Sequence, residues 1–317
     1  MKYKKTFHLL GILITALFFQ SCFLENKTGA TDQFPKVSPN FNFQTVEDFY
    51  QFLTYSDESY PLISAHRGGF MKDYPENCIH TFAKLASKMP IIIECDVRMS
   101  KDSVLVLMHD ETLQRTSTGK GKVKDKTYDE LSNLFLKDSE GQETRYRIPT
   151  LEQALLWGKG IVIYTLDVKQ HVPYDLVINL IKKTKSESNS IIITYSANQA
   201  ALVNRLAPDL MISASIKKVD DLNRLNNLGI PDNRLVAFVG TTEADSTLYS
   251  TLRQHGIKSI LGTIGNLDRS AERAGYQRYA EFVEKGADIL STDRPFEAMK
   301  ALTFYIDKRN IRSPFIL

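Results

Sequence analysis

From Pro61 onward, short apolar or β-branched runs alternate with longer helical stretches. Continuous apolar runs are typical of parallel strands, because the connecting helices bury both faces of the sheet. The predicted strands are 62–65, 91–97, 104–108, 161–168, 191–195, 210–213, 235–239, 259–262 and 288–291. The predicted helices lie around 46–55, 77–88, 150–158, 174–185, 197–206, 219–228, 243–255 and 273–285. The pattern therefore predicts an α/β domain with a mostly parallel sheet.

These nine predicted strands are one more than a (β/α)8 barrel needs. A parallel crossover needs about a dozen residues or more, and only the connection between 91–97 and 104–108 is shorter than that. We therefore predict that these two segments pair as an antiparallel hairpin. The other eight strands then form a TIM barrel, and the hairpin is an extension after the second strand.

The predicted hairpin has a consequence for the chemistry of the chain. A turn centred after Lys101 places Glu94 opposite His109, and Asp96 then lies opposite Leu107. Opposed residues on one face have Cβ atoms about 5 Å apart. Glu94 and Asp96 share a strand face because they are two positions apart. The hairpin is therefore expected to bring a histidine beside two carboxylates.

The N-terminal residues differ in composition from the rest of the chain. A basic segment, 1–5, precedes an apolar run, 7–19, which is too short for a stable membrane span but typical of a signal peptide. Ser21 and Cys22 follow, and this sequence resembles a bacterial lipoprotein cleavage site. We expect a signal peptide at 1–21, a lipid on Cys22, and an exported protein anchored to a bacterial membrane, on its periplasmic face or at the cell surface. A plain signal peptide or an N-terminal anchor remains an alternative.

The mature chain is expected to have a tether and one domain. Residues 22–45 are rich in Asn, Thr, Gly, Ser, Pro and Gln, which is typical of a flexible linker. We predict a tether there and a barrel domain over 46–317. Cys78 and Cys95 lie within that domain, and outside the cytoplasm they can form a disulfide or remain as two buried thiols.

Charge excludes one class of function. The chain has 40 Lys and Arg residues and 37 Asp and Glu residues, and residues 1–21 contain three of the lysines and no acid. The chain after residue 21 is therefore neutral, with no basic stripe suited to nucleic acid. Nothing in the sequence indicates an obligate protein partner.

Ionisable residues interrupt the apolar strands at a few places. His66 ends the first strand and Arg67 follows it; catalytic groups of TIM barrels gather at the carboxyl ends of strands. Glu94 and Asp96 follow three isoleucines, where unpaired inward carboxylates are costly and a metal ion would remove the cost. A structural histidine and a salt-bridged edge strand are the alternatives.

Two further segments contribute candidate site residues. His109 follows the second hairpin strand, and two histidines beside a metal can act as base and acid on opposite sides of a phosphorus. Asp167 and Lys169 share a strand face. We predict Asp167 as a third metal ligand and Lys169 as a phosphate contact, with a surface ion pair as the alternative.

A set of motifs in this order resembles the glycerophosphodiester phosphodiesterase family over residues 61–300. They are His66-Arg67-Gly68, Pro75-Glu76-Asn77, Glu94-x-Asp96-Val97, Lys101-Asp102, His109-Asp110, Leu113-x-Arg115-Thr116, Gly119-x-Gly121, Glu130-Leu131, Ile148-Pro149-Thr150-Leu151 and Thr292-Asp293-x-Pro295. The resemblance implies a distorted (β/α)8 barrel, one divalent cation (Ca²⁺ or Mg²⁺), and cleavage of a glycerophosphodiester substrate into glycerol 3-phosphate and an alcohol.

The resemblance also implies roles by position. They are metal ligands at Glu94 and Asp96, an acid/base pair at His66 and His109, phosphate contacts at Arg67 and Lys169, and polar groups lining the site at Glu76 and Asn77.

Two departures from the family pattern affect substrate preference most. The family's usual Glu-x-Lys is Asp167-Val168-Lys169 here, and the late strand lacks the family's tryptophan. Phe70, Tyr195 and Phe238 are therefore candidates for the aromatic wall. Three other functions remain open: a phospholipase D or C acting on lysolipids or sphingolipids, a non-catalytic surface-binding lipoprotein, and a two-metal hydrolase.

Overall fold

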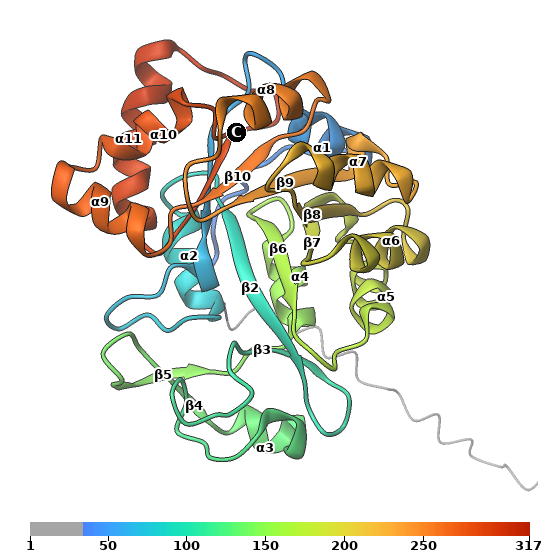
Figure 1. The fold of residues 1–317 in the computed structure, drawn as a ribbon. Helices are drawn as coiled ribbons and strands as arrows, with labels where there is room; N and C mark the ends of the chain where they lie inside the picture. The colour runs from blue at the N-terminus through green and yellow to red at the C-terminus, as the bar shows by residue number, and fades with distance from the viewer. Residues whose placement is uncertain (1–33) are drawn as a thin grey trace, which may run out of the picture.

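The computed structural model describes residues 34–317 of the protein (Figure 1). The predicted signal peptide, 1–21, and the predicted lipidation site, Cys22, lie outside these residues. Within the described part of the chain, no helix is both long and apolar enough to cross a bilayer.

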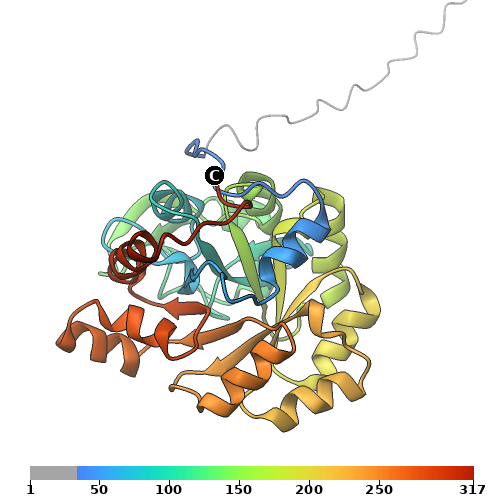
Figure 2. The same cartoon turned by 90° about the horizontal axis from the view of Figure 1, so that it is seen from above.

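The core of the fold is a closed barrel of eight parallel strands with helices around it (Figure 2). The strand order is β1-β11-β10-β9-β8-β7-β6-β2, and β1 also pairs with β2, which closes the barrel. The predicted (β/α)8 architecture is confirmed. The barrel strands are β1 Leu62–Ala65, β2 Ile92–Met99, β6 Ile163–Val168, β7 Ser190–Thr194, β8 Met211–Ser215, β9 Leu235–Gly240, β10 Ser259–Gly262 and β11 Ile289–Thr292.

The helices follow the predicted alternation with three differences. The short helix α3, Tyr128–Ser132, was not predicted. The single helix predicted over 273–285 is wrong: Gly275 adopts a φ of 103° and separates two helices there, because only glycine enters that region without strain. A final helix, α11, begins at Pro295 and was not predicted. The helices are α1 Val46–Leu53, α2 Ile79–Ala86, α3 Tyr128–Ser132, α4 Leu151–Gly158, α5 Tyr174–Thr184, α6 Ala197–Leu206, α7 Val219–Asn227, α8 Ser246–Gln254, α9 Asn266–Ala274, α10 Arg278–Glu284 and α11 Pro295–Arg309.

The short strand β3, Leu105–Leu107, pairs antiparallel with β2, but the predicted register was wrong by one residue. Leu107 lies opposite Val97, not Asp96. The reason is the turn, because Ser103 has a φ of 64° and its N–H donates to the carbonyl of Ser100. A three-residue loop with a left-handed third residue is a common hairpin connection, and its odd length shifts the pairing.

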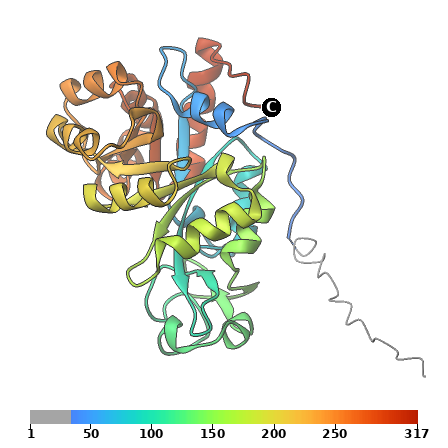
Figure 3. The same cartoon turned by 90° about the vertical axis from the view of Figure 1, so that its right-hand side faces the viewer.

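Residues after β3 form a small lobe beside the barrel (Figure 3). Its strands β4, Phe135–Lys137, and β5, Glu143–Arg147, make a separate two-stranded sheet. Neither strand was predicted: β4 has only three residues, and β5 alternates exposed and half-buried side chains without an apolar run. The lobe has its own apolar cluster, which includes Leu113, Leu131 and Leu136.

The amino end of the barrel is closed by the segment before β1. Helix α1 contributes Phe49 and Phe52 to an apolar cluster with the amino-terminal residues of the strands. The tether prediction fails over its described part, because Phe41 is 3 % exposed and the side-chain amide of Asn40 donates to the carbonyls of Ala86 and Ile161. The folded domain therefore begins before residue 46.

Cys78 and Cys95 are both buried free thiols, so the disulfide alternative is excluded. Burial raises the pKa of Cys78 to about 11. These cysteines are therefore apolar packing residues rather than reactive groups.

Candidate active site

The carboxyl ends of the barrel strands surround a cavity of about 270 Å³. Such a position is where TIM-barrel enzymes carry their active sites. Its lining includes six of the nine residues that the sequence placed in the site: His66, Glu94, Asp96, His109, Asp167 and Lys169.

Three buried carboxylates form a cluster at this cavity. Glu94 and Asp96 lie on β2, and Asp167 lies beside Asp96 in the register of the neighbouring strand β6. One oxygen of each carboxylate lies within 4.8 Å of the other two. The short Asp167 side chain therefore reaches the cluster, because strand pairing places it directly against Asp96.

Lys169 partly compensates this negative charge. Its Nζ lies 2.6 Å from Oδ1 of Asp96 and 2.5 Å from Oδ2 of Asp167. Burial opposes its charge, but the two aspartates outweigh burial and raise the pKa of Lys169. For Glu94, burial and then the neighbouring Asp96 carboxylate raise the pKa well above its usual range.

The cluster fits a hard divalent cation. Three carboxylates face one ammonium group, so negative charge remains uncompensated among the described residues at the cavity. Calcium and magnesium take oxygen ligands and few others. Glu94, Asp96 and Asp167 therefore can bind a metal ion.

His66 begins the short 3₁₀ turn η1, His66–Gly68, directly after β1. Its Nδ1 lies 2.7 Å from Oδ1 of Asp293, which follows β11. A carboxylate at Nδ1 holds the proton there and leaves Nε2 as the reactive nitrogen. Asp293 lies in the Thr292-Asp293-x-Pro295 motif, and no role was predicted for it. Its position just after the last barrel strand was the available signal.

Asp293 is itself held by a buried acid. Its backbone N–H donates to Oδ2 of Asp268 at 3.0 Å, and Oδ1 of Asp268 accepts from the hydroxyls of Thr292 and Tyr279. Asp268 is 3 % exposed and lies on α9. These contacts fix the backbone from which Asp293 reaches His66.

His109 has a similar arrangement on the other side of the cluster. Its Nδ1 lies 2.7 Å from Oδ1 of Asp110, and its Nε2 lies 2.7 Å from Nη2 of Arg67. Since a guanidinium only donates, Nε2 of His109 is the acceptor in this contact. Arg98 donates twice to the carbonyl oxygen of His109 and positions its backbone.

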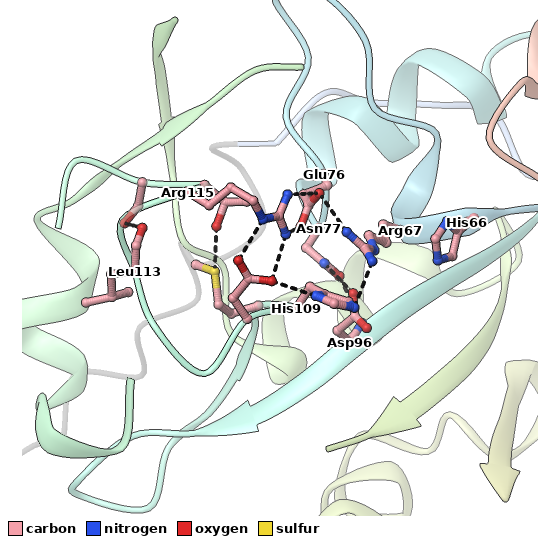
Figure 4. Close-up of polar contacts among 12 residues, drawn as sticks. His66, Arg67, Glu76, Asn77, Asp96, His109, Leu113 and Arg115 are labelled. Atoms are coloured by element: carbon pink, nitrogen blue, oxygen red, sulfur yellow. Dashed lines mark hydrogen bonds and ion pairs between the residues drawn. The ribbon is translucent and has the colours of Figure 1, made fainter. Parts of the chain in front are cut away.

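Three predicted substrate contacts, Arg67, Glu76 and Asn77, do not line the cavity. The side chain of Arg67 is held between Glu76 and His109 (Figure 4), and its backbone N–H donates to Oε2 of Glu94 at 2.6 Å. Asn77 binds Asp96 through both its amide oxygen and nitrogen. Glu76 and Asn77 therefore support the residues around the cavity rather than forming its wall.

Arg115, which lies in the Leu113-x-Arg115-Thr116 motif and had no predicted role, completes this support. Arg115 donates to both oxygens of Glu76 and to both oxygens of Asp110. Hydrogen bonds from Arg115 hold the pKa of Asp110 well below its usual range. Asp110 therefore stays ionised and holds His109.

Of the three candidates for the aromatic wall, two are at the cavity. Tyr195 and Phe238 line it, whereas Phe70 lines a separate cavity beside the small lobe. Tyr195 is 61 % exposed at the rim. Burial of its hydroxyl and the nearby Asp167 raise its pKa, so the phenol stays protonated.

The fold and the position of the cavity are those of a TIM-barrel enzyme. A model of the glycerophosphoryl diester phosphodiesterase family matches residues 66–275. The chain therefore belongs to this family and is a phosphoric diester hydrolase.

Three individual proteins are similar to this chain. The crystal structure of a glycerophosphoryl diester phosphodiesterase from Parabacteroides distasonis is 37 % identical, covers 84 % of this chain and 94 % of its own, and has a TM-score of 0.80. An uncharacterized protein of Bacillus subtilis is 33 % identical over 76 % of this chain and 98 % of its own length. A phosphodiesterase of Oleispira antarctica, solved with sn-glycerol-3-phosphate, is 21 % identical, covers 80 % of this chain and 99 % of its own, and shares the fold with a TM-score of 0.62.

Proposed function

We propose that the protein hydrolyses glycerophosphodiesters to glycerol 3-phosphate and an alcohol with the help of a divalent cation. One observation carries the proposal: His66 and His109, each bound at Nδ1 by an aspartate, line the same cavity as three buried carboxylates. The Oleispira antarctica neighbour, which shares the fold, was solved with glycerol 3-phosphate bound.

Glu94, Asp96 and Asp167 would hold the cation, Ca²⁺ or Mg²⁺. When bound, it would supply Lewis-acid stabilisation of phosphoryl charge and lower the pKa of a bound hydroxyl. Lys169, now between Asp96 and Asp167, is near enough to neutralise a phosphate oxygen beside the cluster. Arg67 would supply a second positive side chain. Its guanidinium would exchange its contact with Nε2 of His109 for one with a phosphate oxygen.

The two histidines would move the protons. One Nε2 takes the proton of the attacking hydroxyl, whose oxygen bonds to phosphorus. The bond from phosphorus to the alcohol oxygen breaks, and the other histidine protonates that oxygen. We favour attack by the 2-hydroxyl of the glycerol group, because an intramolecular nucleophile has a high effective molarity; water then opens the cyclic phosphate. Direct attack by water is the alternative, and a substrate without the 2-hydroxyl separates the two.

The test is release of glycerol 3-phosphate from a panel of glycerophosphodiesters, with Ca²⁺, with Mg²⁺ and with neither. Lysophosphatidylcholine serves as the lipid arm. Metal-dependent release from glycerophosphocholine with little turnover of the lysolipid supports the proposal. Faster turnover of the lysolipid, or no glycerol 3-phosphate from any member of the panel, would overturn it.

We also propose that Cys22 carries the lipid anchor of an exported protein. The support is the basic segment, apolar run and Ser21-Cys22 pair of the sequence. Labelling with a radioactive fatty acid in a bacterial host should mark the wild type but not Cys22→Ser. Equal labelling of both proteins would contradict the anchor.

A further inference from the structure

A second polar cavity lies at the amino end of the barrel, opposite the candidate active site. Its volume is about 580 Å³. It lies between the segment that follows α1 and the end of the chain after α11. Lys258, which directly precedes β10, lines it together with Ser56, Ser59, Arg312 and Ser313.

Lys258 is a buried cation without an acidic partner. Its side chain is 2 % exposed, and within residues 34–317 no carboxylate oxygen lies within 4.0 Å of its Nζ. The ring of Phe52 lies 5.0 Å away. The charge of Asp288 raises the pKa of Lys258, but the Asp288 carboxylate accepts its hydrogen bonds from Ser259 and not from Lys258. A buried, unpaired ammonium group is costly, so this position needs a reason other than packing.

The mouth of the cavity adds a second positive charge. Arg312 is exposed, and Nη1 donates to the backbone carbonyl of Ile311. No carboxylate of the described chain lies within ion-pair distance of its guanidinium. Glu58 is the one acidic residue in the lining, so the charged side chains leave a net positive charge.

Neutral donors line the same cavity as these two cations. The hydroxyl oxygen of Ser59 accepts from the backbone N–H of Ser56, and that of Ser313 accepts from the N–H of Phe315. Each of these oxygens is occupied as an acceptor, so its own proton is available to a ligand. Hydroxyl donors beside a buried lysine and an arginine suit the several acceptor oxygens of a phosphate group.

We propose that this cavity binds a phosphate group, with Lys258 at its closed end and Arg312 at its mouth. Burial lowers the pKa of Lys258 to about 8, and Asp288 offsets part of this effect. A bound phosphate would compensate the ammonium charge that the described chain leaves without an ion-pair partner. The phosphate can be free or belong to a lipid headgroup.

Calorimetric titration with inorganic phosphate, in buffer with a chelator, tests the proposal on the purified chain. Lys258→Met should weaken phosphate affinity about tenfold or more, because it removes a charge-assisted hydrogen bond. Arg312→Gln should weaken it about fivefold. Arg224→Gln is the matched control, because this exposed arginine on α7 lies outside the cavity. The phosphate affinity of this variant should equal that of the wild type. Turnover of glycerophosphodiesters should be the same in all four proteins.

A second arm identifies the source of the phosphate. Co-sedimentation with vesicles of phosphatidylcholine containing phosphatidic acid reports a lipid headgroup, and calorimetry reports the free ion. Loss of either signal in both cavity variants supports the proposal. It is overturned if the wild type and both cavity variants behave alike with both probes. If Lys258→Met does not fold, Arg312→Gln decides, because that side chain is exposed.

Discussion

The two ends of the barrel are built from the same strands but differ in the character of their inward-facing residues. At the amino end the inward residues are apolar, one from each strand: Leu62, Ile92, Ile163, Ile191, Met211, Val236, Ile260 and Ile289. Two positions further along, several strands change to polar residues: Ser64, Glu94, Thr165, Ser213 and Ser291. Toward the carboxyl end, the next layer includes His66, Asp96 and Asp167.

This difference separates stability from chemistry. The apolar layer packs against α1 and gains the free energy of burial. The polar layers contain carboxylates whose burial and mutual repulsion oppose folding, and the same two causes raise the pKa of Glu94. The amino end therefore stabilises a barrel whose carboxyl end is electrostatically costly. The predictions below test this separation, from the largest expected effect to the smallest.

Metal removal should abolish turnover while the barrel stays folded. We expect exhaustive chelation by EDTA to abolish hydrolysis and added Ca²⁺ or Mg²⁺ to restore it. A divalent cation held by the three carboxylates would stabilise the phosphoryl charge, and chelation removes that stabilisation. The measurement is glycerol 3-phosphate release, with the circular dichroism spectrum as a control for folding. Unchanged turnover after chelation would remove the metal from the reaction.

The two histidines should matter for turnover and little for stability. His66→Ala and His109→Ala are each expected to lower kcat by about 10²-fold or more, the usual scale for acid/base groups. His255→Ala is the matched control, since His255 pairs with Asp232 at the same 2.7 Å distance but lies outside the cavity. Near wild-type hydrolysis by both cavity variants would refute their assignment.

Phe49 should show the opposite behaviour. It is fully buried where α1 meets the amino end, so Phe49→Ala should lower the free energy of unfolding by about 3–5 kcal/mol. The control is Phe304→Ala on α11, where the ring is 65 % exposed and little change is expected. Denaturant unfolding measures both. A comparable loss of kcat per folded molecule in Phe49→Ala would break the separation of the two ends.

Lys258 should make the amino end depend on pH. Its folded pKa of about 8 lies below its ordinary value of 10.5, so between these values the unfolded chain binds more protons and stability rises with pH. In phosphate-free buffer, the free energy of unfolding should rise by about 3 kcal/mol across this window relative to Lys258→Met. Parallel pH profiles of the two proteins would contradict the buried, unpaired lysine.

The smallest effect is expected from the acid behind His66. Asp293→Asn keeps the size of the side chain but removes the charge that holds Nδ1–H, and we expect about a tenfold loss of kcat with little change in KM. A pH–rate profile checks this, because the histidine's limb should shift when its carboxylate is lost. An unchanged profile and rate would show that Asp293 does not position His66.

Much of the fold could be predicted because its cause is local. Each barrel strand is a continuous apolar run, and burial on both faces requires such a run wherever the strand lies in the sheet. The hairpin pairing of β2 and β3 followed from connection length alone. The register did not, because it depends on the left-handed conformation of Ser103, which the residue type does not require.

The residues of the candidate active site could also be predicted only in part. His66, Glu94, His109 and Asp167 were recognisable because ionisable residues at the ends of apolar strands need a reason. Asp293 could have been noticed from its position after the last barrel strand, but its pairing with His66 could not, since the two residues lie more than two hundred positions apart.

The sequence alone therefore determined the eight parallel strands, the antiparallel partner of the second strand, and the charged residues that gather at one end. Only the tertiary structure decided which aspartate holds which histidine, that Glu76 and Asn77 lie behind the cavity wall, and that residues before α1 seal the other end. The physical reason is range. Burial pattern and strand direction are set by neighbouring residues. Hydrogen-bond partners, and the segment that closes the amino end, depend on residues that meet only when the barrel closes.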